Sequence, residues 1–145
     1  MNTLFTLNAT DVRKDWSTVM ETAVREKPQF IKRTRDYMVL ADLKLFESLL
    51  SAYEFSAEMF DEADGSVSLS LLQIDLAENG KTEQEARHLL GQAILDYAED
   101  FYREYSLWSA APNRKTHIPY VLKALAIDDA AKIGDAVTLC QAGKS

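Results

Sequence analysis

The sequence predicts an α+β fold made of two consecutive units, and three observations support this prediction. Residues 1–52 contain strand and helix patterns in the order strand, helix, strand, strand, helix. From Tyr53 the pattern changes to the polar–apolar alternation of a β-hairpin, and beyond Thr82 apolar residues recur at helical spacing. For a chain of 145 residues, we therefore expect a βαββα unit over residues 1–52 and a β-hairpin plus helices over residues 53–145.

The first unit begins with a short alternating strand over residues 3–7, followed by a helix over residues 11–25. Asn8 or Thr10 can cap this helix, because their side-chain oxygens accept hydrogen bonds from the first unpaired backbone amides. Pro28 ends it, since proline lacks the amide hydrogen that would continue the helix. One apolar stripe should be buried against the sheet, formed by Val12, Trp16, Val19, Met20, Ala23 and Val24.

Two further strands, over residues 29–32 and 37–40, are joined by the polar turn Arg33–Asp36. Asp42 then caps a second helix. A unit of roughly fifty residues buries too little apolar surface to be stable by itself. We therefore expect a homodimer, or a higher even-numbered oligomer, that covers the remaining apolar surface.

The second unit opens with a predicted hairpin of two strands, over residues 53–60 and 66–71. Asp64 and Gly65 lie between them, and an Asp-Gly pair readily adopts the positive dihedral angles of tight hairpin turns. Asn79-Gly80 indicates a second turn.

Helices should follow this hairpin to the end of the chain. Thr82 and Glu85 form a capping box, at the start of a helix that should run to about Tyr105. A further helix is expected after Pro119. The last one is expected over residues 128–143, because the glycine at its end is a frequent helix stop.

Charge is distributed unevenly along the chain. Residues 1–35 carry seven basic and four acidic side chains, a net charge of +3, whereas residues 51–145 carry eight basic and sixteen acidic side chains, a net charge of −8. The whole chain has a net charge of −7, which argues against general binding of nucleic acid along its length. A basic head on an acidic body suggests two different partners, although two solvated surfaces would give the same counts.

The sequence also bears on the cellular compartment. No apolar run approaches the roughly 18 residues needed to span a bilayer, so no membrane partner is expected. Met1–Phe5 lack the basic stretch and long apolar core of a signal peptide. The single cysteine, Cys140, cannot form an internal disulfide, and its apolar neighbours predict a core thiol. We therefore expect a cytoplasmic protein.

No pattern predicts catalysis, a metal site or a cofactor. The five glycines are scattered and form no phosphate-binding loop, and the histidines and the cysteine share no spacing of metal ligands. His117 is expected to anchor a turn rather than to transfer protons. The carboxylates of Glu99, Asp100 and Glu104 could belong to a small metal-dependent nuclease, but their helical spacing favours a solvated helix face.

Three segments of the first unit form a series. Residues 7–16 are a short strand that leads into a helix with an early arginine, residues 27–33 are a proline followed by a strand that ends in a basic turn, and residues 39–49 are a strand that leads into a helix ending in an aromatic residue and a leucine. In this order and spacing they resemble the Phd/YefM family of type II antitoxins. The resemblance covers residues 1–52, about a third of the chain. Trp16 stands where a smaller aliphatic residue is usual, and the turn Arg33–Asp36 lacks the usual Asn or Gly.

This resemblance implies a dimeric, non-enzymatic antitoxin that represses its own operon by binding operator DNA. Arg13 and Arg33 match basic positions that the family uses against DNA, and arginine is well suited to guanine edges in the major groove. The basic head agrees with this expectation, because each neutralised phosphate releases counterions. Thr10 could help to hold a phosphate near the start of a helix. The expected DNA-binding residues are Thr10, Arg13, Lys14, Lys32, Arg33 and Arg35.

The acidic residues 53–145 are expected to bind and neutralise a cognate toxin. Type II toxins often act on RNA and carry basic faces, as the resemblance implies, and an acidic surface attracts such a face. Tyr102 and Tyr105 lie along the long helix and are the expected toxin-binding residues, since aromatic side chains frequently anchor interfaces. Tyr97 and Phe101 are expected to fill the core of the unit instead.

Two alternatives remain open from the sequence alone. One is a dimeric transcriptional regulator, or a protein-binding module, that keeps the fold but has no toxin. The other, more distant, is the small metal-dependent nuclease.

Overall fold

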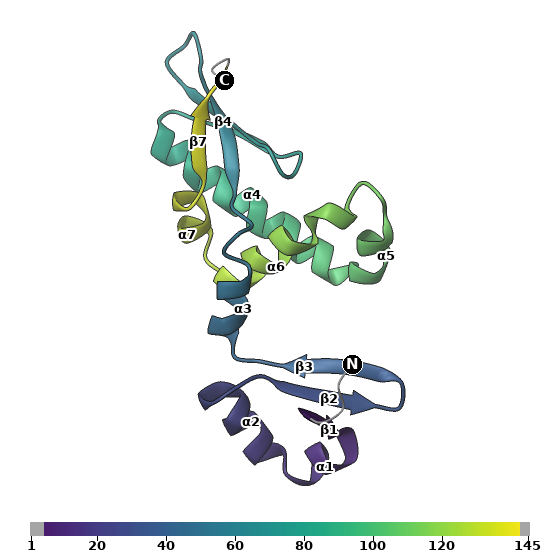
Figure 1. The fold of residues 1–145 in the computed structure, drawn as a ribbon. Coiled ribbons are helices and arrows are strands. Elements are labelled where there is room, and N and C mark those ends of the chain that lie inside the picture. The colour runs from purple at the N-terminus through teal and green to yellow at the C-terminus, as the bar shows by residue number, and fades with distance from the viewer. Residues whose placement is uncertain (1–4, 143–145) are drawn as a thin grey trace. The chain divides into compact units, whose positions relative to one another are not determined.

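The computed structural model describes residues 5–142. Contacts between its residues divide the chain into two units, one ending at Leu49 and the other beginning at Leu50, close to the boundary expected after residue 52. Each unit has its own sheet, with strand orders β1-β2-β3 and β6-β5-β4-β7, and both also contain helices (Figure 1). The predicted α+β class is confirmed.

The N-terminal unit has one small sheet with two helices on one of its faces (Figure 1). Strand β2 pairs parallel with β1 and antiparallel with β3. Ile31 of the central strand is buried with Val12 and Val19 from the helices, which together form the small core of this unit. The elements are β1 (Thr6–Asn8), α1 (Ala9–Lys14), α2 (Trp16–Arg25), β2 (Gln29–Arg33), β3 (Asp36–Leu40) and α3 (Leu43–Leu49).

This order follows the expected strand, helix, strand, strand, helix, but the first helix is interrupted. Asp15, with φ −131° and ψ 46°, ends α1 and precedes α2. Its amide bonds the carbonyls of both Asp11 and Val12, and its own carbonyl accepts the first helical bond of α2, from Val19. Thr3 and Leu4 of the first predicted strand lie outside the described residues.

The prediction of one fully buried helical stripe is wrong. Val12, Val19 and Ala23 are buried, but the side chains of Trp16, Met20 and Val24 are 46%, 41% and 54% exposed. A three-stranded sheet offers too little surface to cover both helices along their whole apolar width.

The C-terminal unit is built around one long helix. α4 packs against strands β5 and β6 and against helices α6 and α7, so that the core lies between the sheet and this helix. Phe55, Leu69 and Ile94 are among its fully buried side chains. The elements are β4 (Ser56–Asp61), β5 (Val67–Leu71), β6 (Ala77–Gly80), α4 (Glu83–Arg103), α5 (Tyr105–Ala110), the 3-10 helix η2 (Lys115–His117), α6 (Ile118–Ile127), α7 (Ala130–Asp135) and β7 (Thr138–Gln141).

The predicted hairpin is confirmed, and so is the Thr82 half of the predicted capping box. β4 pairs antiparallel with β5, and Gly65 in their turn has a φ of 89°, which glycine adopts without steric strain. The amide of Glu85 donates to Thr82 Oγ1 at 3.1 Å, as a capping box requires. The Glu85 carboxylate in turn accepts from the amide of Lys81 at 2.9 Å, one residue before the cap.

Two local predictions in this unit are wrong. Asn79-Gly80 ends strand β6, which pairs with β5, rather than forming a turn; the side-chain amide of Asn79 donates to the hydroxyls of Ser66 and Ser68 across the sheet. At Gly80, a Cβ atom would overlap the backbone of Ala86 at the start of α4. The position therefore requires glycine for close packing.

The described part of the segment predicted as a helix over residues 128–143, which ends at residue 142, is part helix and part strand. After α7 the chain forms β7, which pairs parallel with β4. Cys140 lies on this edge strand and is exposed, so the predicted core thiol is also wrong; its sulfur contacts the carbonyl of Ala57 at 3.5 Å. Val137 fills the core instead.

Helices α4 and α7 cross at a pair of glycines. A Cβ atom on Gly91 would overlap the carbonyl oxygen of Ala130, and one on Gly134 would overlap the carbonyl oxygen of Arg87. The Arg87 guanidinium then closes the end of α7 by donating to the carbonyls of Gly134 at 3.1 Å and Val137 at 2.7 Å. The two helices are therefore held at backbone contact distance.

His117 joins η2 to helix α4, in agreement with its predicted structural role. Its Nδ1 lies 2.7 Å from the Tyr97 hydroxyl. Burial, together with the positive charge of Arg114, lowers the pKa of His117 below its ordinary value near 6.5. The folded protein therefore favours the neutral imidazole.

We expect the stability of the C-terminal unit to fall as the medium becomes acidic. Because the pKa of His117 is lower in the folded state, the unfolded state binds the proton more readily. The contribution of His117 to the free energy of unfolding is complete at pH values above its ordinary pKa and is lost as the pH falls through the lowered pKa. Urea unfolding at about pH 7.5 and about pH 5.5 measures this loss. His117→Asn should reduce the difference between the two conditions; a pH dependence equal to that of the unchanged protein would contradict this role.

Within residues 5–142, no helix is long and apolar enough to cross a membrane.

Candidate nucleic-acid interface

A groove on the N-terminal unit lies between helix α1 and the turn that joins β2 to β3. Of the six residues predicted to bind DNA, four line this groove and two are exposed outside its lining. The folding of the unit thus brings together two segments that are about twenty residues apart in the sequence. α1 contributes Thr10 and Arg13, β2 contributes Lys32 and Arg33, and the two outside the lining are Lys14 and Arg35.

Helix α1 positions the first two of these side chains. Asn8 caps the helix, as predicted, by accepting a hydrogen bond from the Thr10 amide at 2.8 Å. The Arg13 guanidinium, one turn later, lies 3.4 Å from the Thr10 hydroxyl and donates to it. The helix thereby presents a hydroxyl and a guanidinium side by side.

A tight turn positions the other cations. Arg33 and Asp36 are paired across β2 and β3, so that only two residues, Thr34 and Arg35, form the turn. Thr34 has a φ of 56°, a left-handed conformation that is strained for a β-branched residue. Asn and Gly adopt this conformation with less strain, which is why they are the more usual residues in such turns. The tightness of the turn keeps Arg33 and Arg35 exposed within a short segment.

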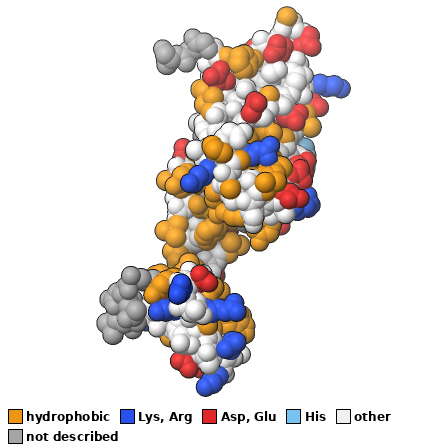
Figure 2. All heavy atoms as spheres, turned by 90° about the vertical axis from the view of Figure 1, so that its right-hand side faces the viewer, with side chains coloured by type: hydrophobic (Ala, Val, Ile, Leu, Met, Phe, Trp, Pro, Cys, Tyr) orange, Lys and Arg blue, Asp and Glu red, His pale blue; other side chains and the backbone are white. Residues whose placement is uncertain are grey.

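The predicted DNA-binding cations take no part in the ion pairs of the described residues. Within residues 5–142, Arg13, Lys14, Lys32, Arg33 and Arg35 form no ion pair, and no carboxylate lines the groove. The Lys32 ammonium instead lies 5.5 Å from the centre of the Tyr37 ring. Figure 2 shows Lys and Arg side chains gathered on the N-terminal unit. Unpaired cations of this kind can contact phosphate groups without first breaking an ion pair.

Three apolar residues that were not predicted to bind DNA line the same groove. Trp16, Met38 and Val39 lie in its lining and are 46%, 45% and 58% exposed. Trp16 had a signal of its own, because it departs from the aliphatic residue usual at this position. Met38 and Val39 could be recognised only once β3 was known to be an edge strand.

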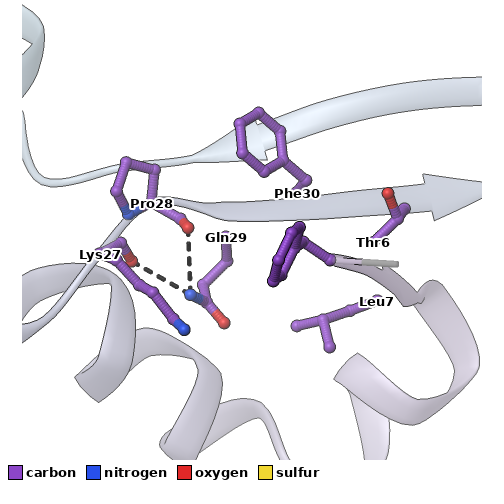
Figure 3. Close-up of a pocket in the computed structure, with 7 residues that line it drawn as sticks. Thr6, Leu7, Lys27, Pro28, Gln29 and Phe30 are labelled. Carbon is purple, nitrogen blue, oxygen red and sulfur yellow. Dashed lines mark hydrogen bonds between the residues drawn. The ribbon is translucent and has the colours of Figure 1, made fainter. Parts of the chain in front are cut away.

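A second hollow of the N-terminal unit differs in chemistry (Figure 3). It is lined by residues of β1 and of the segment leading into β2, and among its described lining residues Lys27 alone is charged. The Gln29 side-chain amide crosses it and donates to the carbonyls of Lys27 and Pro28, each at 3.1 Å. Its lining contains none of the predicted DNA-binding residues.

In the C-terminal unit, the aromatic residues of α4 and α5 have different environments. Phe101 is fully buried and Tyr97 is half-buried, whereas Tyr102 is 62% exposed. Tyr105 lies between these environments: its ring centre is 5.8 Å from that of Phe101 and 6.2 Å from that of Tyr102. Tyr102 therefore presents most of its ring to solvent, and the ring of Tyr105 contacts it edge-on.

The carboxylates considered for a nuclease site lie on the solvated side of α4. Arg103 pairs with Asp100 at 2.8 Å and with Glu99 at 3.7 Å. Within residues 5–142, no group of three or more His, Cys, Asp or Glu side chains is arranged to hold a metal ion.

Comparison with known proteins adds evidence that is independent of these residues. Residues 1–139 match the model of a family named PHD-like and described as the antitoxin of RelE/RelB toxin-antitoxin systems. The match extends well beyond the first 52 residues that carried the resemblance in the sequence. No curated protein matches the chain.

A solved structure is also similar over nearly the whole length of both chains. It is a crystal structure of the antitoxin part of a proposed toxin/antitoxin system from Syntrophomonas wolfei subsp. wolfei, at 1.80 Å resolution. The two sequences are 33% identical and the TM-score is 0.87, with 94% of this chain and 98% of the other covered. Both units therefore have counterparts in the similar protein.

Proposed function

The chain belongs to the PHD-like family of toxin-antitoxin antitoxins, and on this basis we propose that it divides its work between its two units. The N-terminal unit binds operator DNA and represses the operon, and the C-terminal unit binds the cognate toxin. Within the family, the N-terminal unit is of the Phd/YefM type. An antitoxin is a regulatory protein rather than an enzyme, and it implies a toxin as partner.

The observation that carries the DNA-binding proposal is the groove between α1 and the β2–β3 turn. Arg13, Lys32 and Arg33 line it, no carboxylate is among its described lining residues, and Thr10 adds a hydroxyl donor. Cations on a groove wall neutralise phosphates and release counterions, which gives affinity for DNA at any sequence. Arginines that also reach base edges add sequence preference.

We expect Arg13→Ala and Arg33→Ala each to weaken binding to operator DNA by about 1–3 kcal/mol if these residues contact bases. If they contact phosphates only, affinity should fall for all sequences and the salt dependence should become shallower by about one unit of slope per residue. Gel-shift titration with a duplex from directly upstream of the reading frame, at several salt concentrations, separates these cases.

The matched control is Arg25→Ala. Arg25 is an exposed arginine of the same unit, but it lies on α2 outside the groove and pairs with Glu21 at 2.7 Å. This control should bind as the unchanged protein does. Unaltered affinity in both groove variants would exclude the groove as the DNA-binding site.

The bare face of the N-terminal sheet supports a homodimer. Ile31 points to the helices, so its neighbours along β2 point to the opposite face. The cross-strand pairs Phe30–Val39 and Lys32–Tyr37 lie on this face, where Phe30, Tyr37 and Val39 are each between 41% and 58% exposed and the Lys32 ammonium lies over the Tyr37 ring. An apolar sheet face of this kind is stabilised when a second copy covers it.

We expect the protein to have twice the mass of the 16.3 kDa chain in solution, and Phe30→Lys to shift it towards the monomer. A lysine at Phe30 would place a charge within the apolar contact between two copies. Light scattering over a wide concentration range measures the mass. Leu72→Lys, at a similarly exposed apolar residue of the C-terminal unit, is the control. A mass of one chain at every concentration would rule out this dimer.

The toxin-binding proposal rests on charge and on exposed aromatic rings in the C-terminal unit. Residues 51–145 have a net charge of −8, which suits a basic partner surface. Tyr102 near the end of α4 and Tyr105 at the start of α5 offer a pair of rings in edge-to-face contact, and Leu107 on α5 is 69% exposed. Rigid aromatic side chains that are partly exposed are typical anchors of protein interfaces.

A further inference from the structure

Trp16 is the largest exposed side chain of the groove. It is the first residue of α2, directly after the break at Asp15, and its side chain is 46% exposed. Within residues 5–142 it has no ring partner, and its indole N–H makes no hydrogen bond. A tryptophan that contributes to a protein core normally loses most of its exposure and finds an acceptor for this N–H. The small core of this unit does not explain it.

The surroundings of the indole indicate what it could contact. Arg13 and Arg33 line the same groove together with Met38, and no carboxylate is among its described lining residues. A groove that combines cations with an aromatic and an aliphatic side chain matches a nucleotide, which presents a phosphate and an apolar sugar or base within a few ångströms. In duplex DNA the matching apolar groups are deoxyribose and the thymine methyl group.

We propose that Trp16 is a DNA-contacting residue, whose indole packs on the sugar or base of a nucleotide while Arg13 and Arg33 hold phosphates on either side. This inference rests on the proposed binding of operator DNA by the groove. It adds an apolar contact to an interface that was inferred from cations alone. The positive lining favours DNA over a second copy of the chain, since a second copy would bring its own arginines into the same groove.

Trp16 can report on its own contact, because the chain has two tryptophans. The other, Trp108, belongs to the C-terminal unit, where the Arg114 guanidinium covers its ring at 3.9 Å. The variant Trp108→Phe therefore leaves Trp16 as the single indole. Its emission is titrated with a duplex from directly upstream of the reading frame, and with a scrambled duplex of equal length. We expect quenching that saturates along the same curve as a gel shift.

A second arm measures affinity. Trp16→Leu, the aliphatic replacement, should weaken DNA binding about tenfold, within the range of alanine substitutions at stacking aromatics. Met20→Leu is the matched control, because Met20 is 41% exposed on the same helix and lies outside the groove. Circular dichroism verifies that both variants keep their helices. If Trp108→Phe lowers stability, the difference in emission between the unchanged protein and Trp16→Phe gives the same signal.

The outcomes separate this inference from the proposed function. If Arg13→Ala weakens DNA binding but Trp16 shows no quenching and Trp16→Leu binds normally, the Trp16 contact is wrong and the DNA-binding groove stands. If no variant and no duplex gives a shift, the proposed operator binding itself fails. If Trp16 emission changes on dilution without DNA, the groove is occupied by a second copy and the inference is overturned.

Discussion

Replacing Gly91 with alanine is expected to lower the free energy of unfolding of the C-terminal unit by about 3 kcal/mol or more. The added methyl group would overlap the carbonyl oxygen of Ala130 and the backbone of Gly134, neither of which can turn aside as a long side chain could. Helices α4 and α7 would have to separate. The separation would also lengthen the hydrogen bonds by which Arg87 closes α7.

The intrinsic preference of the helix acts in the opposite direction. In a helix interior, alanine is more favourable than glycine by about 1 kcal/mol, so stabilisation is expected if only local preference mattered. The overlap between the two helix backbones is expected to cost more free energy than alanine's helix preference provides. Gly91→Ala should therefore be destabilising. Gln92→Ala, at the exposed neighbouring position of α4, is the control and should change stability by less than about 0.5 kcal/mol.

Urea unfolding, followed by the emission of Trp108 in a Trp16→Phe background, measures the free energy of the C-terminal unit alone. A Gly91→Ala variant that is as stable as the unchanged protein, or more stable, would show that α4 and α7 do not meet at backbone distance. Gly134→Ala tests the same crossing from the other helix.

Phe101→Ala is expected to lower the stability of the C-terminal unit strongly, and Tyr102→Ala is expected to leave it almost unchanged, although the two residues are adjacent. Phe101 is fully buried, and its ring packs edge-on against Tyr105 and Trp108. Its removal should cost about 3–5 kcal/mol of stability. Tyr102 is 62% exposed, so its removal should change stability by less than about 0.5 kcal/mol.

Toxin binding, in contrast to stability, should depend on Tyr102. Tyr102→Ala should remain folded and yet bind the product of the adjacent reading frame at least tenfold more weakly, which corresponds to about 1.4 kcal/mol or more for an interface anchor. Titration calorimetry measures the affinity, and Leu72→Ala is a control at an exposed apolar residue elsewhere in the unit. Normal affinity of the folded Tyr102 variant would exclude this residue from the toxin interface.

Much of the fold followed from local patterns. The alternation of apolar residues predicted β4 and β5, because one strand face must be buried whatever the rest of the chain does. β2 and β3 were predicted as two short strands on either side of the polar turn Arg33–Asp36. Caps at Asn8 and Thr82 and the glycine at position 65 were also predictable, since each satisfies a hydrogen bond or a dihedral angle within a few residues. The uneven charge and the basic residues of the N-terminal unit likewise stand in the sequence itself.

Tertiary structure decided the features that depend on distant partners. Residues 138–141 form β7 rather than a helix because β4, about eighty residues earlier, offers a free edge with which they pair. The exposure of Trp16 and Met20 depends on how little of α2 a three-stranded sheet can cover. Four of the predicted DNA-binding residues share one groove only because β2 lies beside α1. Local sequence determines which side chains a segment carries and how it begins and ends, whereas burial and grouping arise from contacts between segments that no short window of sequence contains.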